Sequence, residues 1–313
     1  MGFPKLDERL RAARLEPPRG RVRVILDTDT YNEIDDQFAL AQMVLSPDRM
    51  KVEAIHAAPF HNDRSSGPAD GMQKSYEEIL RLLELLRVSP QGLVFKGSTA
   101  WMSRKDQPVP SEAADNLIRL AMRGGDEPLY VLAIGAITNV ASALVREPRL
   151  VERIVLVWLG GNELHCETAR EFNLQQDPIA SQIVFDCGVP LVQIPCRNVT
   201  THLLTTLPEL ERYLKGQSPL ADYLYRIVQE YGGGYCWSKV IWDVAAPSWV
   251  LDGRWVPGRL VPSPILNDDL TWKLDPARHR IRIATGVDRD AILGDVFRKV
   301  AEFRREGGGI TSS

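Results

Sequence analysis

The sequence predicts an α/β fold built on a mainly parallel sheet flanked by helices. Short, continuous apolar runs rich in β-branched residues alternate with helical patterns over most of the chain, which is typical of strands buried on both faces. The last third changes character: residues 207–250 look helical, and residues 255–287 combine prolines with short strands. We therefore expect one α/β domain with a helical and β-hairpin elaboration in its C-terminal third.

The expected elements follow one another along the chain. Strands are expected over residues 21–29, 51–58, 93–98, 128–135, 153–161 and 191–196, with short ones over 270–275 and 280–286. Helices are expected over residues 33–46, 70–87 and 289–305. We interpret residues 1–20 as an N-terminal extension, 21–306 as a single domain and 307–313 as a flexible tail. In such a sheet, ligands bind at the carboxyl ends of the strands.

Composition and charge argue against several classes of protein. The 313 residues are 44% hydrophobic, which is enough for a sizeable core, and a net charge of -3 gives no electrostatic reason to expect nucleic acid or an anionic membrane. No apolar run approaches the roughly 20 residues that span a bilayer. The N-terminus lacks the apolar core of a secretory signal, and the four cysteines include no CxxC pair. We expect a soluble, cytoplasmic protein.

An acidic cluster stands at the first strand-to-helix junction, in VILDTDTYNEIDDQFAL (24–40). Asp27 and Asp29 end the strand and point to one side of it, because residues i and i+2 share a face. Asp35 and Asp36 open the helix. Four aspartates this close raise one another's pKa values unless a cation compensates their charge. Oxygen ligands without histidine or thiolate favour calcium or magnesium.

Acidic residues also gather at helix starts, in EF-hand loops and in some phosphatases. Helix capping, with Asn32 as N-cap, explains Glu33 in the first turn but not the four aspartates as a group. An EF-hand loop counted from Asp27 would need glycine and glutamate where Asn32 and Phe38 stand. A magnesium-dependent phosphatase of the haloacid-dehalogenase type, with Asp27 as nucleophile, stays possible, although Tyr31 departs from its DxDx[TV] motif.

Four segments resemble, in order, those of the inosine–uridine nucleoside hydrolase family. The DxDxxxDD motif is present with two extra residues between its acidic pairs, and AIGAITNVASAL (133–144) resembles TGxLTNxAxAL. WLGGN (158–162) and REFNLQQDP (170–178) resemble the MGG and AEFNxxxDP segments, and WDVAA (242–246) falls where the family has HDPxA. The resemblance implies a Rossmann-like fold, a calcium-dependent N-glycosidase acting on ribonucleosides in purine salvage, and a homo-oligomer, as dimer or tetramer.

The resemblance also implies a role for each matching position. The calcium ligands would be Asp29, Asp36, Asp243 and the backbone carbonyl of Ile134, and Asp29 would also be the catalytic base that activates water. The substrate-binding residues would be Asp35, Asn62 (or its neighbour His61), Leu159, His165, Glu171, Asn173 and Trp242. Asp27 would support the site from behind its ligands.

A role for Asp243 in metal binding can also be argued from the surrounding sequence. Asp243 lies in SKVIWDVAAPSWVL (238–251), an expected helix that is apolar on nearly every side. A carboxylate buried there costs several kcal/mol unless it is paired or metal-bound, although it could instead cap a backbone N–H. Lys239, one helical turn earlier, is expected to be a solvated lysine, with a general acid as the alternative.

The leaving-group end departs from the usual family pattern. Trp242 stands where the inosine–uridine group has histidine and the purine-preferring members have tryptophan, which implies a purine-leaning substrate. His165 stands where an asparagine usually contacts the ribose 5′-hydroxyl, which fits either a histidine in that role or a substrate altered at C5′. The alternatives are therefore a hydrolase of a modified ribosyl compound, or a calcium- and ribose-binding protein without turnover.

Overall fold

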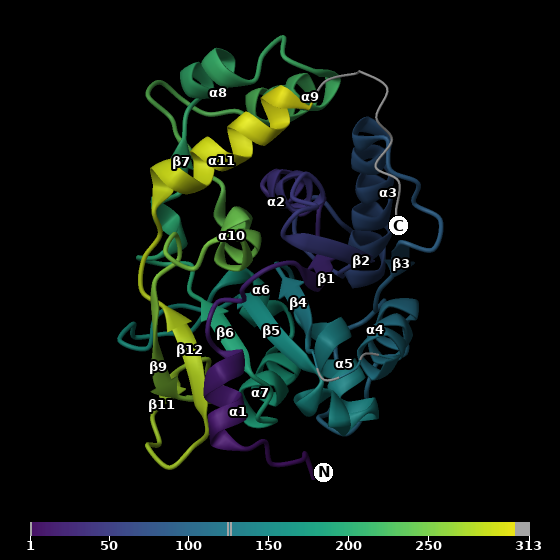
Figure 1. Ribbon diagram of the computed structural model, residues 1–313, viewed down its shortest axis with the longest axis vertical. Coiled ribbons are helices and arrows are strands. Elements are labelled where there is room, and N and C mark those ends of the chain that lie inside the picture. The colour runs from purple at the N-terminus through teal and green to yellow at the C-terminus, as the bar shows by residue number, and fades with distance from the viewer. Residues whose placement is uncertain (1, 124, 126, 304–313) are drawn as a thin grey trace.

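The computed structural model describes residues 2–123, 125 and 127–303 (Figure 1). Its central sheet has eight strands in the order β3-β2-β1-β4-β5-β6-β12-β9. These are β1 (Val22–Thr28), β2 (Met50–Ala57), β3 (Val94–Lys96), β4 (Leu129–Ala133), β5 (Ile154–Leu159), β6 (Leu191–Ile194), β9 (Gly258–Pro262) and β12 (Arg280–Ala284). Among the described strands of this sheet, only β9 and β12 pair in antiparallel fashion. The predicted fold class and the six early strands are confirmed.

Helices cover both faces of this sheet (Figure 1). The core on one face receives buried side chains from α2 (Asp36–Val44), α3 (Pro68–Leu86), α8 (Leu207–Tyr213), α9 (Pro219–Tyr231), α10 (Ala245–Leu251) and α11 (Arg289–Glu302). The core on the other face receives them from α4 (Glu112–Arg123), α5 (Thr138–Arg146) and α7 (Pro178–Asp186). Val24 and Leu26 of β1 face the first core and Ile25 faces the second. The sequence of a strand that is buried between two cores is therefore a continuous apolar run.

The remaining elements are short. They are α1 (Glu8–Arg14), α6 (Phe172–Gln176), η1 (Pro148–Glu152), η2 (Thr200–His202), η3 (Trp242–Val244), β7 (Leu204–Thr205), β8 (Lys239–Val240), β10 (Ile265–Leu266) and β11 (Trp272–Lys273). Strands β7 and β8 pair with each other, as do β10 and β11. The C-terminal elaboration is thus confirmed, but β9 and β12 extend the central sheet instead of forming a separate hairpin. The predicted tail over residues 307–313 lies outside the described residues.

Two predicted helices begin later than the sequence suggested. Helix α2 starts at Asp36, its N-cap position is held by Asp35, and Asn32 lies in the preceding turn, so Asn32 is not the N-cap. The helix expected over 238–251 starts only at Ala245. Pro247 explains the second difference, because proline fits the first turn of a helix but breaks its interior. Asp243 therefore lies in the short η3 turn.

The strand order places several loop segments at one edge of the sheet. Strand β1 lies between β2 and β4, so successive strands run outward from it in both directions, and this switch point is where α/β sheets open a crevice. Asp27 pairs in register with Ala133, and Ala133 with Trp158. The residues that follow β1, β4, β5 and β6 are therefore neighbours.

Helix α1 ties the predicted N-terminal extension to the domain. Arg11 is buried and its Nη1 donates to the Gly188 carbonyl, while Arg14 Nη1 donates to the Glu152 carbonyl at 2.6 Å. Leu15 is fully buried in the main core, and its carbonyl accepts from Arg282. We propose that the described part of this extension, residues 2–20, folds together with the domain.

Leu15→Ala is expected to lower the free energy of unfolding by about 2–5 kcal/mol, because it leaves a cavity in the core. Leu10→Ala is the matched control, since Leu10 lies on α1, which ends directly before Leu15, but is 43% exposed, and it should change stability by less than about 0.5 kcal/mol. Urea unfolding measures both variants. Equal stability of the Leu15 variant and the parent would show that α1 is a dispensable extension.

No helix among the described residues is both long enough and apolar enough to cross a membrane. The longest described helix, α3, is amphipathic, and its polar face carries charged side chains such as Lys74 and Glu77.

Candidate active site

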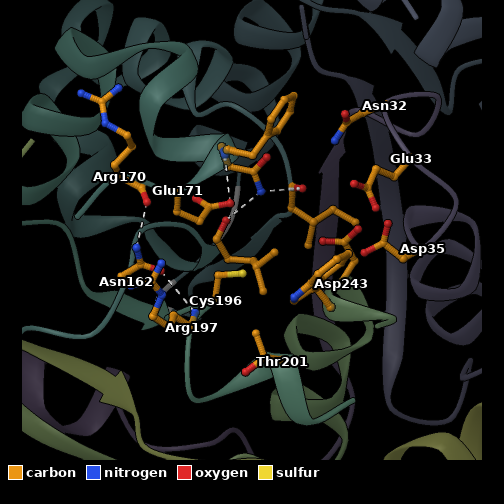
Figure 2. Close-up of a pocket in the computed structure, with 15 residues that line it drawn as sticks. Asn32, Glu33, Asp35, Asn162, Arg170, Glu171, Cys196, Arg197, Thr201 and Asp243 are labelled. Atoms are coloured by element: carbon orange, nitrogen blue, oxygen red, sulfur yellow. Dashed lines mark hydrogen bonds between the residues drawn. The ribbon is translucent and has the colours of Figure 1, made fainter. Parts of the chain in front are cut away.

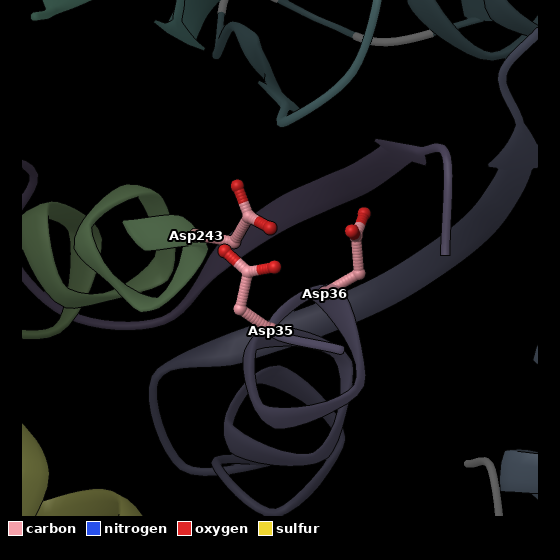
Figure 3. Close-up of side chains that lie close together, drawn as sticks. All are labelled: Asp35, Asp36 and Asp243. Atoms are coloured by element: carbon pink, nitrogen blue, oxygen red, sulfur yellow. The ribbon is translucent and has the colours of Figure 1, made fainter. Parts of the chain in front are cut away.

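Three carboxylates converge at the carboxyl edge of the sheet. Asp35 and Asp36 stand at the start of α2, and Asp243 reaches them from η3 (Figure 3). All three are buried, and one carboxylate oxygen from each lies within 4.8 Å of the others. Residues more than 200 positions apart in the chain thus form one cluster.

Asp29 lies next to this cluster, one residue beyond the end of β1. It is fully buried, and neither carboxylate oxygen has a hydrogen-bond partner among the described residues. Burial, followed by the charges of Asp36 and Asp35, raises its pKa well above the usual range. A buried carboxylate without partners is costly, so this side chain points to a ligand.

The pKa values of Asp36 and Asp243, two members of the cluster, are also raised. Burial and the charge of Asp35 raise the pKa of Asp36 to about 7, although Thr28 donates a hydrogen bond to it. Burial and the same neighbour raise the pKa of Asp243. Hard oxygen donors gathered in this way fit a divalent cation of the calcium or magnesium type.

Asp27 lies behind the cluster. It is fully buried, its Oδ2 accepts from Asn139 Nδ2 at 2.9 Å, and His56 Nδ1 lies 3.8 Å away. Burial raises the pKa of Asp27 to about 7. Asn139 belongs to the AIGAITNVASAL segment, so two of the segments recognised in the sequence meet here. This arrangement suits a supporting residue better than a nucleophile, because a nucleophile needs access to substrate.

A cavity of about 310 Å³ opens beside the acidic cluster (Figure 2). The predicted site residues that line it are Asp35, Ile134, Leu159, Glu171, Asn173, Trp242 and Asp243. These residues come from five separate stretches of the chain. The resemblance-based assignment therefore selected residues that the fold brings together, while their individual roles stay predictions.

Glu171 and Asn173 shape the wall of the cavity between β4 and β5. Glu171 caps α6, accepting from Asn173 N at 3.0 Å and from Leu174 N at 3.1 Å, and it also accepts from Gly161 N at 2.9 Å. Asn173 Nδ2 donates to the carbonyls of Ile134 and Leu159, both at 3.0 Å. The amide of Asn173 therefore ties α6 to the ends of both strands.

Lys239 is not a solvated lysine on a helix, as the sequence suggested. It lies on β8, is 4% exposed, and pairs with Glu33. Its Nζ lies 4.2 Å from the Trp242 ring centroid and 4.9 Å from that of Tyr231. Glu33 therefore lies before α2 and not in its first turn, and it pairs with Lys239, which is held against the tryptophan that lines the cavity.

Two predicted substrate contacts lie outside this cavity. Asn62 Nδ2 donates to Asn32 Oδ1 at 2.7 Å, so Asn62 braces the turn before α2 while Asn32 itself lines the cavity. The His165 side chain is 69% exposed, lies 3.7 Å from Glu163, and faces a different hollow that Arg259 and Thr285 also line.

Several lining residues were not predicted from the sequence to bind metal or substrate. They are Asn32, Glu33, Asn162, Arg170, Phe172, Cys196, Arg197 and Thr201. Cys196 and Arg197 follow β6, so the rule that ligands bind beyond strand carboxyl ends could have found them. Asn162 directly follows the Gly160–Gly161 pair, and it is the last residue of the WLGGN segment.

Comparisons with known proteins agree with this geometry. A model of the family described as "Inosine-uridine preferring nucleoside hydrolase" matches residues 24–294, which span the acidic cluster and every wall of the cavity. The chain belongs to this family. It is therefore an enzyme of the nucleoside hydrolase class, an N-glycosidase, and the recognition made from four sequence segments is confirmed.

Among the relatives of this nucleoside hydrolase is the pyrimidine-specific ribonucleoside hydrolase RihA of Salmonella paratyphi A, which is 27% identical over 257 residues, 73% of this chain and 79% of that protein. A probable uridine nucleosidase 2 of Arabidopsis thaliana is 25% identical over 67% of this chain and 70% of its own. Both are named for pyrimidine nucleosides, so the purine preference implied by Trp242 is not confirmed.

Solved structures confirm the fold of the nucleoside hydrolase. The purine-preferring ribonucleoside hydrolase of Gardnerella vaginalis superposes with a TM-score of 0.69 at 21% identity, covering 90% of this chain and 98% of that one. An inosine-guanosine nucleoside hydrolase superposes with a TM-score of 0.74 at 18% identity, covering 90% and 99%. At these identities the likeness concerns the fold alone.

Proposed function

We propose that this nucleoside hydrolase cleaves the N-ribosidic bond of a purine-leaning ribonucleoside to free base and ribose, with Ca²⁺ at the acidic cluster. The observation that carries the proposal is Asp29, whose two buried carboxylate oxygens have no partner among the described residues and which interacts electrostatically with Asp35, Asp36 and Asp243. The phosphatase alternative loses its support, because Asp27 is buried against Asn139.

The donor set fits a hard cation. Asp29, Asp36, Asp243 and the carbonyl of Ile134 would hold it, and Asp35 lies close enough to share it or to hold a ribose hydroxyl. When bound, the cation offsets the carboxylate charges and lowers the pKa of a neighbouring water.

The chain's own residues would then divide the reaction between them. Asp29 takes a proton from the attacking water, whose oxygen bonds to C1′. The bond from C1′ to the base nitrogen breaks through an oxocarbenium-like transition state, and its electron pair leaves with the base. Asp35, Glu171 and Asn173 grip ribose hydroxyls, and this binding away from the reacting bond holds C1′ in place.

Trp242 would serve the leaving base by stacking. A tryptophan ring offers a broad, polarisable face, and a purine buries more of it than a pyrimidine does. The Trp242 Nε1 atom is buried without a partner among the described residues. Lys239 lies over the same ring at 4.2 Å, which fixes the orientation of the indole through a cation–π contact.

Lys239→Met is expected to lower kcat/KM for a purine ribonucleoside about tenfold, because it removes both the contact to Trp242 and the partner of Glu33. Steady-state kinetics with one purine and one pyrimidine nucleoside measure the effect. The matched control is Lys105→Met, since the Lys105 side chain is 54% exposed and pairs with Asp186 away from the cavity. Equal kinetics of the Lys239 variant and the parent would contradict a role for Lys239 at the base.

The decisive experiment is a substrate panel. The purified protein is incubated with Ca²⁺ and purine or pyrimidine ribonucleosides, and free ribose is measured, with Asp29→Ala as the inactive control. Ribose from purine nucleosides alone supports the whole proposal. Ribose from uridine keeps the reaction and overturns the role of Trp242. Bound Ca²⁺ without any ribose would favour a binding protein or a modified ribosyl substrate.

We also propose a cytoplasmic homo-oligomer, dimer or tetramer, that acts in purine salvage. All four cysteines are free, which suits a reducing compartment. The oligomeric state rests on the family resemblance, and light scattering of the purified protein tests it.

A further inference from the structure

The cavity has two ends of opposite charge. Figure 2 shows Glu33, Asp35 and Asp243 gathered at one side and Arg170 and Arg197 at the other, with Glu171 between them. Both arginines are exposed at the rim. Neither makes an ion pair among the described residues, and the guanidinium of Arg170 donates a hydrogen bond to a neutral side chain there, from Nη1 to Gln175 Oε1 at 3.4 Å.

A single buried amide holds both arginine-bearing segments in place. Asn162, 3% exposed, donates from Nδ2 to the Arg170 carbonyl at 2.8 Å and accepts at Oδ1 from Arg197 N at 3.2 Å. Its own carbonyl accepts from Trp272 Nε1 at 3.2 Å. Two segments far apart in sequence are therefore fixed side by side at the mouth of the cavity.

Glu171 does not neutralise these arginines. Its two oxygens accept from three backbone N–H groups, those of Gly161, Asn173 and Leu174, and Glu171 makes no ion pair with either arginine among the described residues. The positive charge at this end is left for a ligand. Guanidinium groups bind phosphate and carboxylate in paired hydrogen bonds, more strongly than they bind a neutral hydroxyl.

We propose that the ribosyl substrate carries an anionic group, a phosphate monoester or a carboxylate, at C5′, and that Arg170 and Arg197 bind it. This inference rests on the proposed function. The acidic cluster would hold the ribose diol and Trp242 the base, so the remaining side of the sugar would face the side of the cavity lined by Arg170 and Arg197.

The reaction itself is unchanged. Water bonds to C1′ and loses a proton to Asp29, the C1′–N bond breaks, and the base leaves with the electron pair and takes up a proton. A nucleoside 5′-monophosphate thus gives free base and ribose 5-phosphate, with the phosphate ester intact.

The test compares three substrates that differ only at C5′: a purine ribonucleoside, its 5′-monophosphate and its 5′-carboxylate. We expect at least a tenfold higher kcat/KM for one of the two anionic substrates, a preference that weakens as ionic strength rises. Arg197→Gln should lower that preference roughly tenfold to 100-fold, the usual worth of a charge-assisted hydrogen bond. Arg170→Gln should act in the same direction. The control is Arg119→Gln, an exposed arginine on α4 outside the cavity.

A binding measurement separates this inference from the proposed function. Ribose 5-phosphate is titrated into the calcium-loaded protein and into Arg197→Gln by calorimetry, and binding should be at least tenfold weaker in the variant. Base release from the plain nucleoside with no gain from either anion, and equal binding by the two proteins, would overturn the inference and leave the proposed function standing. Release of inorganic phosphate from the 5′-monophosphate would overturn both. Binding lost in the variant, with no turnover of any substrate, would support the arginine site and refute the hydrolase mechanism.

Discussion

Asp29→Asn is expected to reduce kcat by about 10³-fold or more while the fold stays intact. The change keeps the shape of the side chain but removes the group that accepts the proton from water, a contribution that alone is worth about 10²–10⁴-fold. It also removes one of the carboxylates that would bind the cation. Base release under saturating Ca²⁺ measures the loss, and circular dichroism checks the fold.

The same variant should be more stable than the parent when the cation is absent. Asp29 is buried without a partner, and Asp36 and Asp35 both raise its pKa, so a neutral amide relieves repulsion in the folded state. Each kcal/mol of repulsion removed raises Tm by about 2–4 °C in a protein of this size or slightly smaller. Thermal unfolding in a chelator measures this, with the exposed Asp48→Asn as control. A fall in Tm together with retained activity would show that Asp29 is structural.

Much of the fold could be predicted because its strands lie between two cores. Burial on both faces makes each strand an apolar run, and β1 is an example, since Val24 and Ile25 enter opposite cores. The start of α2 was misplaced because Glu33, Asp35 and Asp36 look like a favourable first helical turn, whereas Asp35 and Asp36 turn toward Asp243. A pattern based on the helix dipole cannot anticipate a carboxylate that arrives from a distant segment.

Site residues could be predicted where their chemistry is unusual for the surrounding sequence. Asp243 stood out as a carboxylate in apolar surroundings, and it lies in the cluster. The environment of Lys239 was wrongly predicted because its charged partner, Glu33, lies far away in the sequence. The neighbouring Tyr231 carries no charge that would indicate a pairing, and the three side chains meet only in the folded chain. Arg170 and Arg197 were missed for a related reason: arginine is ordinarily a surface residue, and the Asn162 hydrogen bonds that join their two segments form only in the folded chain.

Asp243→Asn is expected to weaken Ca²⁺ binding by about 100-fold. The free energy of unfolding of the variant should therefore depend much less on Ca²⁺ than that of the parent. A cation that binds only the folded state stabilises it by RT ln(1 + [L]/Kd), about 2.7 kcal/mol at a free concentration of 100 Kd. At the same concentration the variant would retain about 0.4 kcal/mol by that relation. Urea unfolding with and without Ca²⁺ measures both values.

The chelated state provides the internal control for this prediction. Without the ion, the buried charge of Asp243 faces Asp35 and Asp36, so the variant should be at least as stable as the parent there. The order of stability should therefore reverse between chelator and Ca²⁺. A variant less stable by the same amount in both conditions would mean that Asp243 supports the fold by itself, and the acidic cluster would have to be explained without a cation.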